Sequence, residues 1–189
     1  MESGYSSEKN TIKSEFCISE RNTSFPLGLS PVGEREPIIL ILGSFPSQKS
    51  LSRQEYYGNP KNQFWLIIEM ILGIPIVLPY KKRLDILSSR GILLWDVLFS
   101  CTREGSSDST IQEPIPNDIR GLLELHPSIR CIVLNGVTGA GKYFQAFFPD
   151  IISAGIVTVC VLPSTSPAYA GMPVLEKAEK WKAIIRFLY

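Results

Sequence analysis

With 189 residues, the chain is long enough for one well-buried domain and short for two. Hydrophobic residues make up 44% of it and charged residues 20%, which excludes the disordered and fibrous classes. The formal net charge of +1 gives no overall attraction to nucleic acid, so phosphate contacts would need a local group of side chains. No apolar stretch approaches the roughly 20 residues of a membrane span, and no secretory signal is recognisable, so we expect a cytoplasmic protein.

The N-terminal part of the chain predicts a leader, a covering loop and one buried strand. Residues 1–23 are polar, and we expect a loose leader there, followed by one domain over residues 24–189. Residues 24–32 are apolar but contain Pro and Gly, which is typical of a loop. Residues 38–42 form a short apolar run that stops at Gly43, and this indicates a fully buried strand of a parallel sheet.

Further strands and helices alternate along the rest of the chain. Apolar runs predict three more strands, at residues 92–100, 129–134 and 156–162. Helical spacing predicts helices at residues 62–72, 116–125 and 173–189, the second of which opens with a proline in its first turn. The polar residues 102–116 indicate a long surface loop. This alternation predicts an α/β fold, a single-domain three-layer sandwich with a central, mainly parallel four-stranded sheet flanked by helices.

Unusual residues follow the predicted strands, at the edge where open parallel sheets bind ligands. Residues 43–47 (GSFPS) follow the first strand, and their backbone N–H groups can bind a carbonyl or a developing anion, although a plain turn is the simpler interpretation. Asn135 follows the third strand and can bond a ligand or cap a turn. Residues 163–167 (PSTSP) follow the last strand and suit either phosphate binding or a rigid loop.

Another motif precedes the first predicted helix. Tyr56 and Tyr57 are followed by a Gly-Asn-Pro turn, and Asn62 then opens an apolar helix that contains Phe64 and Trp65. An isolated Asn at this position is most often a helix cap. Tyr57 can be an aromatic residue of the core or of a pocket rim.

In their order and approximate spacing, these motifs resemble the uracil-DNA glycosylase superfamily. The resemblance rests on the GSFPS turn, on NPKNQFW at residues 59–65 and on LPSTSPAYA at residues 162–170. The run LWDV at residues 94–97, with the Ser-Cys, Gly-Ser and Asp-Ser pairs that follow it, resembles the hypoxanthine-DNA glycosylase branch in particular. The resemblance spans residues 25–181, which is most of the chain.

The resemblance implies a monofunctional DNA-deoxyinosine glycosylase, an enzyme that hydrolyses the N-glycosidic bond of a flipped, deaminated base. We expect damaged DNA as its partner, a monomer, and no cofactor, metal or membrane. Phe45 stands where most of the superfamily carries an Asp or Asn that acts on water, so the resemblance assigns the water to Asn62 instead. Asn59 stands where relatives usually have His, which argues against a proton-donating role there.

The resemblance also implies two sets of binding residues. The residues expected to hold the flipped base, with Tyr57 as its stacking platform, are Gly43, Ser44, Phe45, Tyr57 and Asn135. The residues expected to contact the rest of the DNA are Ser47, Pro163, Ser164, Thr165, Ser166, Pro167 and Tyr169.

Other reactive side chains receive no catalytic role. Asp96 lies within the second predicted strand, and we expect it to be structural and bonded to loop amides. His126 lies between a helix end and the start of a strand, which is the wrong side of the sheet. The four cysteines are scattered without a CxxC pair, so neither a metal site nor a cluster is expected. No lysine is a candidate for a Schiff base.

Two other interpretations stay open, and a third is disfavoured. A uracil- or mismatch-specific glycosylase of the same fold would carry the same motifs, because uracil and hypoxanthine share a carbonyl beside an N–H. A non-catalytic damaged-DNA-binding protein would explain the missing carboxylate of the first motif. A nucleotide-binding protein using residues 135–142 (NGVTGAGK) is disfavoured, because Tyr143 replaces the Ser or Thr that a phosphate loop requires.

Overall fold

A computed structural model describes residues 26–33 and 36–188. The predicted leader at residues 1–23 therefore lies outside the described residues. Four strands form a central sheet in the order β2-β1-β5-β6, and every neighbouring pair is parallel, which confirms the predicted sheet. The strands are β1 (Ile39–Gly43), β2 (Ile92–Asp96), β5 (Cys131–Asn135) and β6 (Thr158–Leu162).

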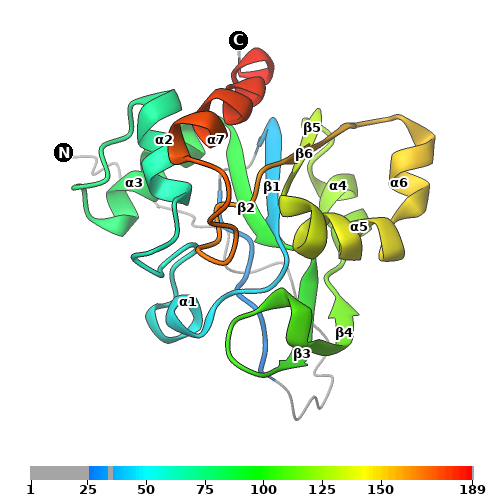
Figure 1. The fold of residues 1–189 in the computed structure, drawn as a ribbon. Helices are drawn as coiled ribbons and strands as arrows, with labels where there is room; N and C mark the ends of the chain where they lie inside the picture. Colours follow the sequence, from blue (N-terminus) through cyan, green and yellow to red (C-terminus); the bar gives the residue numbers. More distant parts are fainter. Residues whose placement is uncertain (1–25, 34–35, 189) are drawn as a thin grey trace, which may run out of the picture.

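Helices cover both faces of this sheet (Figure 1), as the three-layer prediction requires. One layer contains α2 (Phe64–Leu72), α3 (Tyr80–Ser89) and α7 (Val174–Trp181). The other contains α4 (Ile119–Leu125), α5 (Lys142–Phe147) and α6 (Pro149–Ala154). The short helix α1 (Gln48–Arg53) follows β1 at the carboxyl edge of the sheet.

The sheet lies at the centre of the hydrophobic core. All five residues of β1 are buried, because a central parallel strand is covered on both faces. Phe64 on α2, Phe144 on α5 and Trp181 on α7 are fully buried beside it, and the rings of Phe64 and Trp181 meet edge to face at 5.9 Å. Burial of one such side chain contributes about 1.5–3 kcal/mol, and this packing fixes the helices that carry the site.

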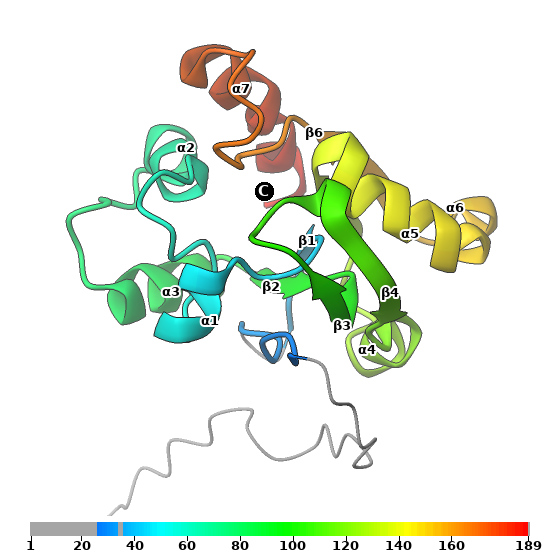
Figure 2. The same cartoon turned by 60° about the horizontal axis from the view of Figure 1, so that its bottom comes forward.

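The single strand predicted at residues 92–100 is wrong, because the chain breaks at Val97. β2 ends at Asp96, and the following β3 (Leu98–Arg103) leaves the sheet and pairs antiparallel with β4 (Ile111–Pro116), in front of the carboxyl edge (Figure 2). The Val97 N–H donates to the Gly43 carbonyl at 2.9 Å, so the backbone stays hydrogen-bonded through the break. The unbroken run of buried side chains conceals the break in the sequence.

Residues 102–116, predicted as a loop, form most of this hairpin. They contain the end of β3, the 3-10 turn η1 (Asp108–Thr110) and β4. Pro116 therefore ends a strand instead of opening a helix. Helix α4 begins at Ile119, where Asp118 caps it by accepting from the Gly121 N–H at 2.9 Å. The polar composition reflects the exposure of a small two-stranded sheet.

The other predicted elements differ from the structure mainly at their ends, whereas the helices α1, α3, α5 and α6 had no predicted range. The helix predicted at residues 173–189 continues after α7 as the 3-10 segment η3 (Lys182–Phe187). After β5, the wide turn η2 (Gly136–Gly141) leads into α5. Within residues 26–33 and 36–188, no helix combines the length and apolar character that a membrane crossing needs.

Candidate active site

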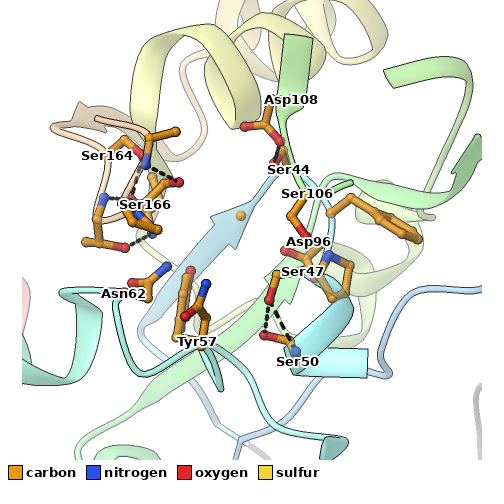
Figure 3. Close-up of a pocket in the computed structure, with 18 of the residues that line it drawn as sticks. Ser44, Ser47, Ser50, Tyr57, Asn62, Asp96, Ser106, Asp108, Ser164 and Ser166 are labelled. Carbon is orange, nitrogen blue, oxygen red and sulfur yellow. Dashed lines mark hydrogen bonds between the residues drawn. The ribbon is translucent and has the colours of Figure 1, made fainter. Parts of the chain in front are cut away.

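A pocket of about 300 Å³ opens at the carboxyl edge of the sheet, where β1, β2 and β5 end (Figure 3). It is lined by segments far apart in sequence: the turn after β1, residues 56–62, the β3–β4 hairpin and the loop after β6. Two of the predicted residues, Pro163 and Tyr169, are not part of its lining. The predicted residues that line it are Gly43, Ser44, Phe45, Ser47, Tyr57, Asn62, Asn135, Ser164, Thr165, Ser166 and Pro167.

Gly43, Asp96 and Tyr57 form the inner end of the pocket, which we call the pocket floor. Gly43 and Asp96 end neighbouring strands and are register partners. A Cβ on Gly43 would lie 2.3 Å from Asp96 Oδ1 and 3.7 Å from the Tyr57 hydroxyl. Side chains do not approach each other as closely as 2.3 Å, so glycine is needed for the carboxyl group to lie against the end of β1.

Tyr57 has a left-handed backbone, with a φ of 56° that is unusual for a residue with a side chain. Its ring stacks on Phe64, with centroids 3.8 Å apart and 20° between the planes. Its hydroxyl is buried and has no hydrogen-bond partner among the described residues. Burial, and then the nearby Asp96, raise the pKa of this hydroxyl well above its ordinary value, and the nearby Asn135 side chain opposes them only in part, so the hydroxyl keeps its proton and can donate.

Asn62 lies beside Tyr57 on the pocket wall (Figure 3). Its Oδ1 accepts from the Phe64 N–H at 2.9 Å, which is the capping contact that an isolated Asn predicts. The oxygen has a second lone pair and the amide nitrogen carries two hydrogens, so this contact leaves the side chain able to bind water or a ligand. Asn62 therefore combines the capping contact with a place in the pocket.

The turn after β1 is fixed to the β3–β4 hairpin by a small polar network. Ser44 Oγ donates to Asp108 Oδ1 at 2.6 Å, and Arg103 lies 3.9 Å from the same carboxylate. Arg103 also donates to the Pro46 carbonyl at 2.5 Å and covers the Phe45 ring at 5.2 Å. In the described part of the chain, the backbone N–H groups of Ser44 and Phe45 have no acceptor. The turn thus presents free donors on a fixed support.

Sequence reasoning missed Arg103 and gave Asp108 no role. Both residues lie in the segment predicted as a loop, residues 102–116, so nothing in the sequence indicated that they pack against the GSFPS turn. Recognition of the β3–β4 hairpin would have been the signal. Burial raises the pKa of Asp108, while the hydrogen bond from Ser44 and the charge of Arg103 act in the opposite direction.

Asn135 holds the loop after β6 in place. Its Oδ1 accepts from the Thr165 N–H and its Nδ2 donates to Thr165 Oγ1, both at 2.9 Å. The Gln63 N–H donates to the Thr165 carbonyl, also at 2.9 Å. Thr165 is fully buried and its hydroxyl accepts from Asn135, so its side chain faces the protein, and its contact with DNA stays a prediction. Asn135 lines the pocket, but its amide forms hydrogen bonds with the turn at Thr165. This agrees with the alternative interpretation, in which Asn135 caps a turn.

The other polar residues near the pocket mouth make local contacts. Ser164 Oγ and Ser166 Oγ each accept from the backbone N–H two residues further on, at 3.2 and 3.3 Å. Ser47 caps α1 by accepting from a backbone N–H at 3.2 Å. The Pro163 carbonyl accepts from an indole N–H on α7 at 2.9 Å, and Tyr169 is exposed. Contact of these residues with DNA stays a prediction.

Lys177 on α7 is a buried cation that sequence reasoning also missed. None of its surface is exposed, and its Nζ donates to Gln63 Oε1 at 2.8 Å and to the Tyr169 carbonyl at 2.6 Å. Burial lowers its pKa. The signal was weak: Lys177 precedes the buried Trp181 by four residues and so lies on the same helix face. It ties the loop after β6 to the segment that precedes α2.

Asp96 does not lie mid-strand, where the sequence placed it, because it ends β2 and lines the pocket. Only 4% of it is exposed, and its Oδ2 has no hydrogen-bond partner among the described residues. Burial raises its pKa to about 8; Asp108 adds to this effect, and Arg103 opposes it. The Asp96 carboxyl is therefore mostly protonated at neutral pH.

The side chains to which the sequence analysis gave no catalytic role are mostly absent from the pocket lining. His126 follows the last residue of α4 and is not part of the pocket lining. Of residues 135–142, only Asn135 lines the pocket. Within residues 26–33 and 36–188, no group of three or more His, Cys, Asp or Glu side chains is arranged to hold a metal ion.

Two curated proteins named hypoxanthine DNA glycosylase are similar to this chain. The protein from Methanosarcina acetivorans is 39% identical over 160 residues, which cover 84% of this chain and 97% of the relative. The protein from Methanosarcina barkeri is 36% identical over 139 residues, which cover 73% of this chain and 85% of the relative.

A solved structure has the same fold. It is a solution NMR structure of a candidate uracil DNA glycosylase from Methanosarcina acetivorans, with a TM-score of 0.72 and 36% identity over 86% of this chain and 97% of that one. No family model matches the chain. Because a curated relative is matched over nearly its whole length at 39% identity, the chain belongs to the hypoxanthine DNA glycosylase family of the uracil-DNA glycosylase superfamily.

Proposed function

We propose that this protein is a DNA repair enzyme that removes hypoxanthine from deoxyinosine in DNA by hydrolysing the N-glycosidic bond of the flipped nucleotide. The observation that carries the proposal is the pocket in which Asn62, Tyr57 and the free N–H groups of the GSFPS turn lie together. Both curated relatives carry this activity in their names. A volume of about 300 Å³ is small for a ligand pocket and suits one base taken out of the duplex.

The flipped base is held by stacking and by backbone hydrogen bonds. Flipping costs a few kcal/mol, and stacking on an aromatic ring recovers about 1–3 kcal/mol. Tyr57 offers that ring, supported by Phe64 behind it. The N–H groups of Ser44 and Phe45 donate to the carbonyl edge of the base and stabilise the negative charge that develops as it leaves.

Asn62 positions the water. As the glycosidic bond breaks, the sugar becomes a cation of oxocarbenium type, which needs a well-placed water more than a strong nucleophile. An amide is no effective base, but it can orient water, and orientation alone contributes several kcal/mol to catalysis. Phe45 offers no polar side chain for this task, so Asn62 is the side chain on the pocket wall best suited to it.

The DNA backbone is held at the pocket mouth. Ser47, Ser164 and Ser166 present hydroxyls there, and Pro167 and Tyr169 are exposed on the same loop, where they can fill the space that the flipped base vacates. The exposed Lys49 and Lys61 lie two residues after Ser47 and one before Asn62. These lysines supply the local positive charge that the net charge of +1 does not.

The test is a glycosylase assay on matched duplex oligonucleotides that carry deoxyinosine, deoxyuridine, deoxyxanthosine or no lesion at one position. We expect release of free hypoxanthine and an alkali-labile abasic site, fastest with deoxyinosine, and no release from undamaged DNA. Faster release of uracil would instead support a uracil-specific glycosylase. This is the second candidate, because the similar solved structure is described as a candidate uracil DNA glycosylase. Tight binding of damaged DNA without any release would instead establish a non-catalytic binding protein.

A further inference from the structure

Two polar atoms at the pocket floor are buried without a partner. They are Asp96 Oδ2 and the Tyr57 hydroxyl, and Ser100 Oγ is the one other buried side-chain nitrogen or oxygen of this kind in the described chain. Buried polar groups are nearly always hydrogen-bonded, so an exception calls for a physical reason. Two of the three exceptions belong to residues that line the same pocket, and a ligand in that pocket would satisfy both.

The backbone is built so that these two groups converge. Gly43 has no Cβ, and that missing atom would lie 2.3 Å from the Asp96 carboxyl and 3.7 Å from the Tyr57 hydroxyl. Figure 3 shows the Asp96 and Tyr57 side chains at the lining of the pocket, with Asn62 on the side of Tyr57. The carboxyl group therefore lies where a base held by the GSFPS turn would meet it.

The surroundings keep this carboxyl neutral. The titratable groups that act on it are Asp108 and Arg103 from the hairpin, with Tyr56 and Tyr57 from the segment before α2. Burial is the largest influence and raises the pKa of Asp96 to about 8. At neutral pH the group has a proton to give, which an ordinary surface aspartate does not have.

We propose that Asp96 is the proton donor to the departing base, an inference that rests on the proposed function. The bond between C1′ and the purine N9 breaks, and its electron pair goes to the base. The Asp96 proton goes to an acceptor nitrogen of the purine ring, so the base leaves neutral. The water held by Asn62 gives its oxygen to C1′, and its proton restores the Asp96 carboxyl through solvent.

The test is the pH dependence of single-turnover excision from deoxyinosine DNA, from about pH 5.5 to about pH 9.5, for the wild type and Asp96→Asn. We expect the wild-type rate to be constant up to a break near pH 8 and to fall about tenfold per pH unit above it. Asp96→Asn, which is isosteric and uncharged, should be slower by a hundredfold or more and should lack the break. If Asp96 were only structural, its replacement by Asn would leave the break in the pH profile where it is.

Two further variants separate this role from damage to the fold. Asp108→Asn removes the like charge that raises the pKa of Asp96, so the break should move to lower pH. Ser100→Ala removes the third unpartnered buried oxygen, on β3 and outside the pocket lining, and should leave the rate and the profile unchanged. Thermal unfolding and binding of damaged DNA at pH 7 check that each variant is folded.

The outcomes are distinct. A wild-type profile without a break, or an Asp96→Asn rate close to that of the wild type, would overturn the inference and leave the proposed function standing. A break that persists in Asp96→Asn would overturn the inference as well. It would then come from another group, such as the ring N–H of hypoxanthine, which also ionises in alkaline solution. A protein that releases no base at any pH would overturn the proposed function and this inference with it.

Discussion

The half of the pocket at the ends of β1 and β2 leaves several of its polar groups unpaired, whereas the half at the ends of β5 and β6 bonds its polar groups to one another. In the first half, Asp96 Oδ2, the Tyr57 hydroxyl and two backbone N–H groups of the GSFPS turn have no partner in the described chain. In the second half, Asn135, Thr165 and Lys177 each make two or more hydrogen bonds within the protein.

This difference separates chemistry from support. An unpaired buried group costs about 1–3 kcal/mol, which a protein sustains where a ligand completes the bonding. A fully bonded cluster holds a loop at a fixed distance and has little left to offer a substrate. We therefore assign the reaction to the β1–β2 half, and the shape of the pocket to the β5–β6 half.

Gly43→Ala should have the largest effect, because the new Cβ would lie 2.3 Å from Asp96 Oδ1. We expect excision to fall by a hundredfold or more, since misplacing a reacting group by about 1 Å costs that much. Forcing a methyl group into this site should also lower the free energy of unfolding by about 1–3 kcal/mol. Gly171→Ala meets nothing within 4 Å and is the matched control. A wild-type rate in Gly43→Ala would show that the close approach has no part in the reaction.

The Asp96 carboxyl should make stability depend on pH. Its pKa is raised from 3.8 to about 8 in the folded state. Its contribution to the free energy of unfolding is therefore complete below about pH 4, declines as the pH rises to about 8, and is constant above pH 8. As the pH rises across this window, the free energy of unfolding of Asp96→Asn should increase relative to that of the wild type by up to about 1.4 kcal/mol per pH unit. Urea unfolding at several pH values measures it. A difference that does not change with pH would show that Asp96 is ionised in the folded protein.

Lys177→Met should weaken the supporting half without touching the reaction. Loss of its hydrogen bonds to Gln63 and to the Tyr169 carbonyl should cost about 1–3 kcal/mol of stability. We expect the KM for damaged DNA to rise about tenfold, with kcat changed much less, because the loop after β6 loses its anchor. Lys180→Met, on the exposed face of the same helix, is the control. A fall in kcat at unchanged KM would place Lys177 in the reaction itself.

Lys61→Ala should have the smallest effect. Removing one phosphate contact lowers the slope of log Kd against log salt by about 0.9 and weakens binding to damaged and undamaged DNA alike. Lys82→Ala, on the exposed surface of α3, should leave the slope unchanged. Equal slopes for all three proteins would show that Lys61 does not contact the DNA backbone.

Sequence patterns predicted the buried half of the molecule better than its carboxyl edge. The strands β1 and β5 were predictable because each is a short apolar run covered on both faces, and β6 because it is an equally short apolar run, although this edge strand is only partly buried. The break at Val97 was not, because the side chains on both sides of it are buried and the run looks continuous. That one error hid the β3–β4 hairpin and placed Asp96 inside a strand instead of at its end.

The site was predictable where residue type decides the contact. Asn62, Tyr57 and the GSFPS turn line one pocket, as the motifs indicated. Whether a side chain faces the pocket or the protein depends on tertiary contacts that no local pattern contains. Thr165 lies in a polar loop yet is fully buried, and Lys177 lies in a charged helix yet reaches inward to Gln63.

The role of Asn62 in positioning water is best measured by single-turnover release of hypoxanthine at saturating enzyme, in wild type, Asn62→Ala and Asp118→Ala. Both variants lose a contact at a helix start, but Asp118 caps α4 and is not part of the pocket lining, so it controls for the stability cost of about 0.5–2 kcal/mol. We expect Asn62→Ala to bind damaged DNA normally but to release base at least a hundredfold more slowly, while Asp118→Ala keeps the wild-type rate. Equal rates in all three proteins would contradict this role.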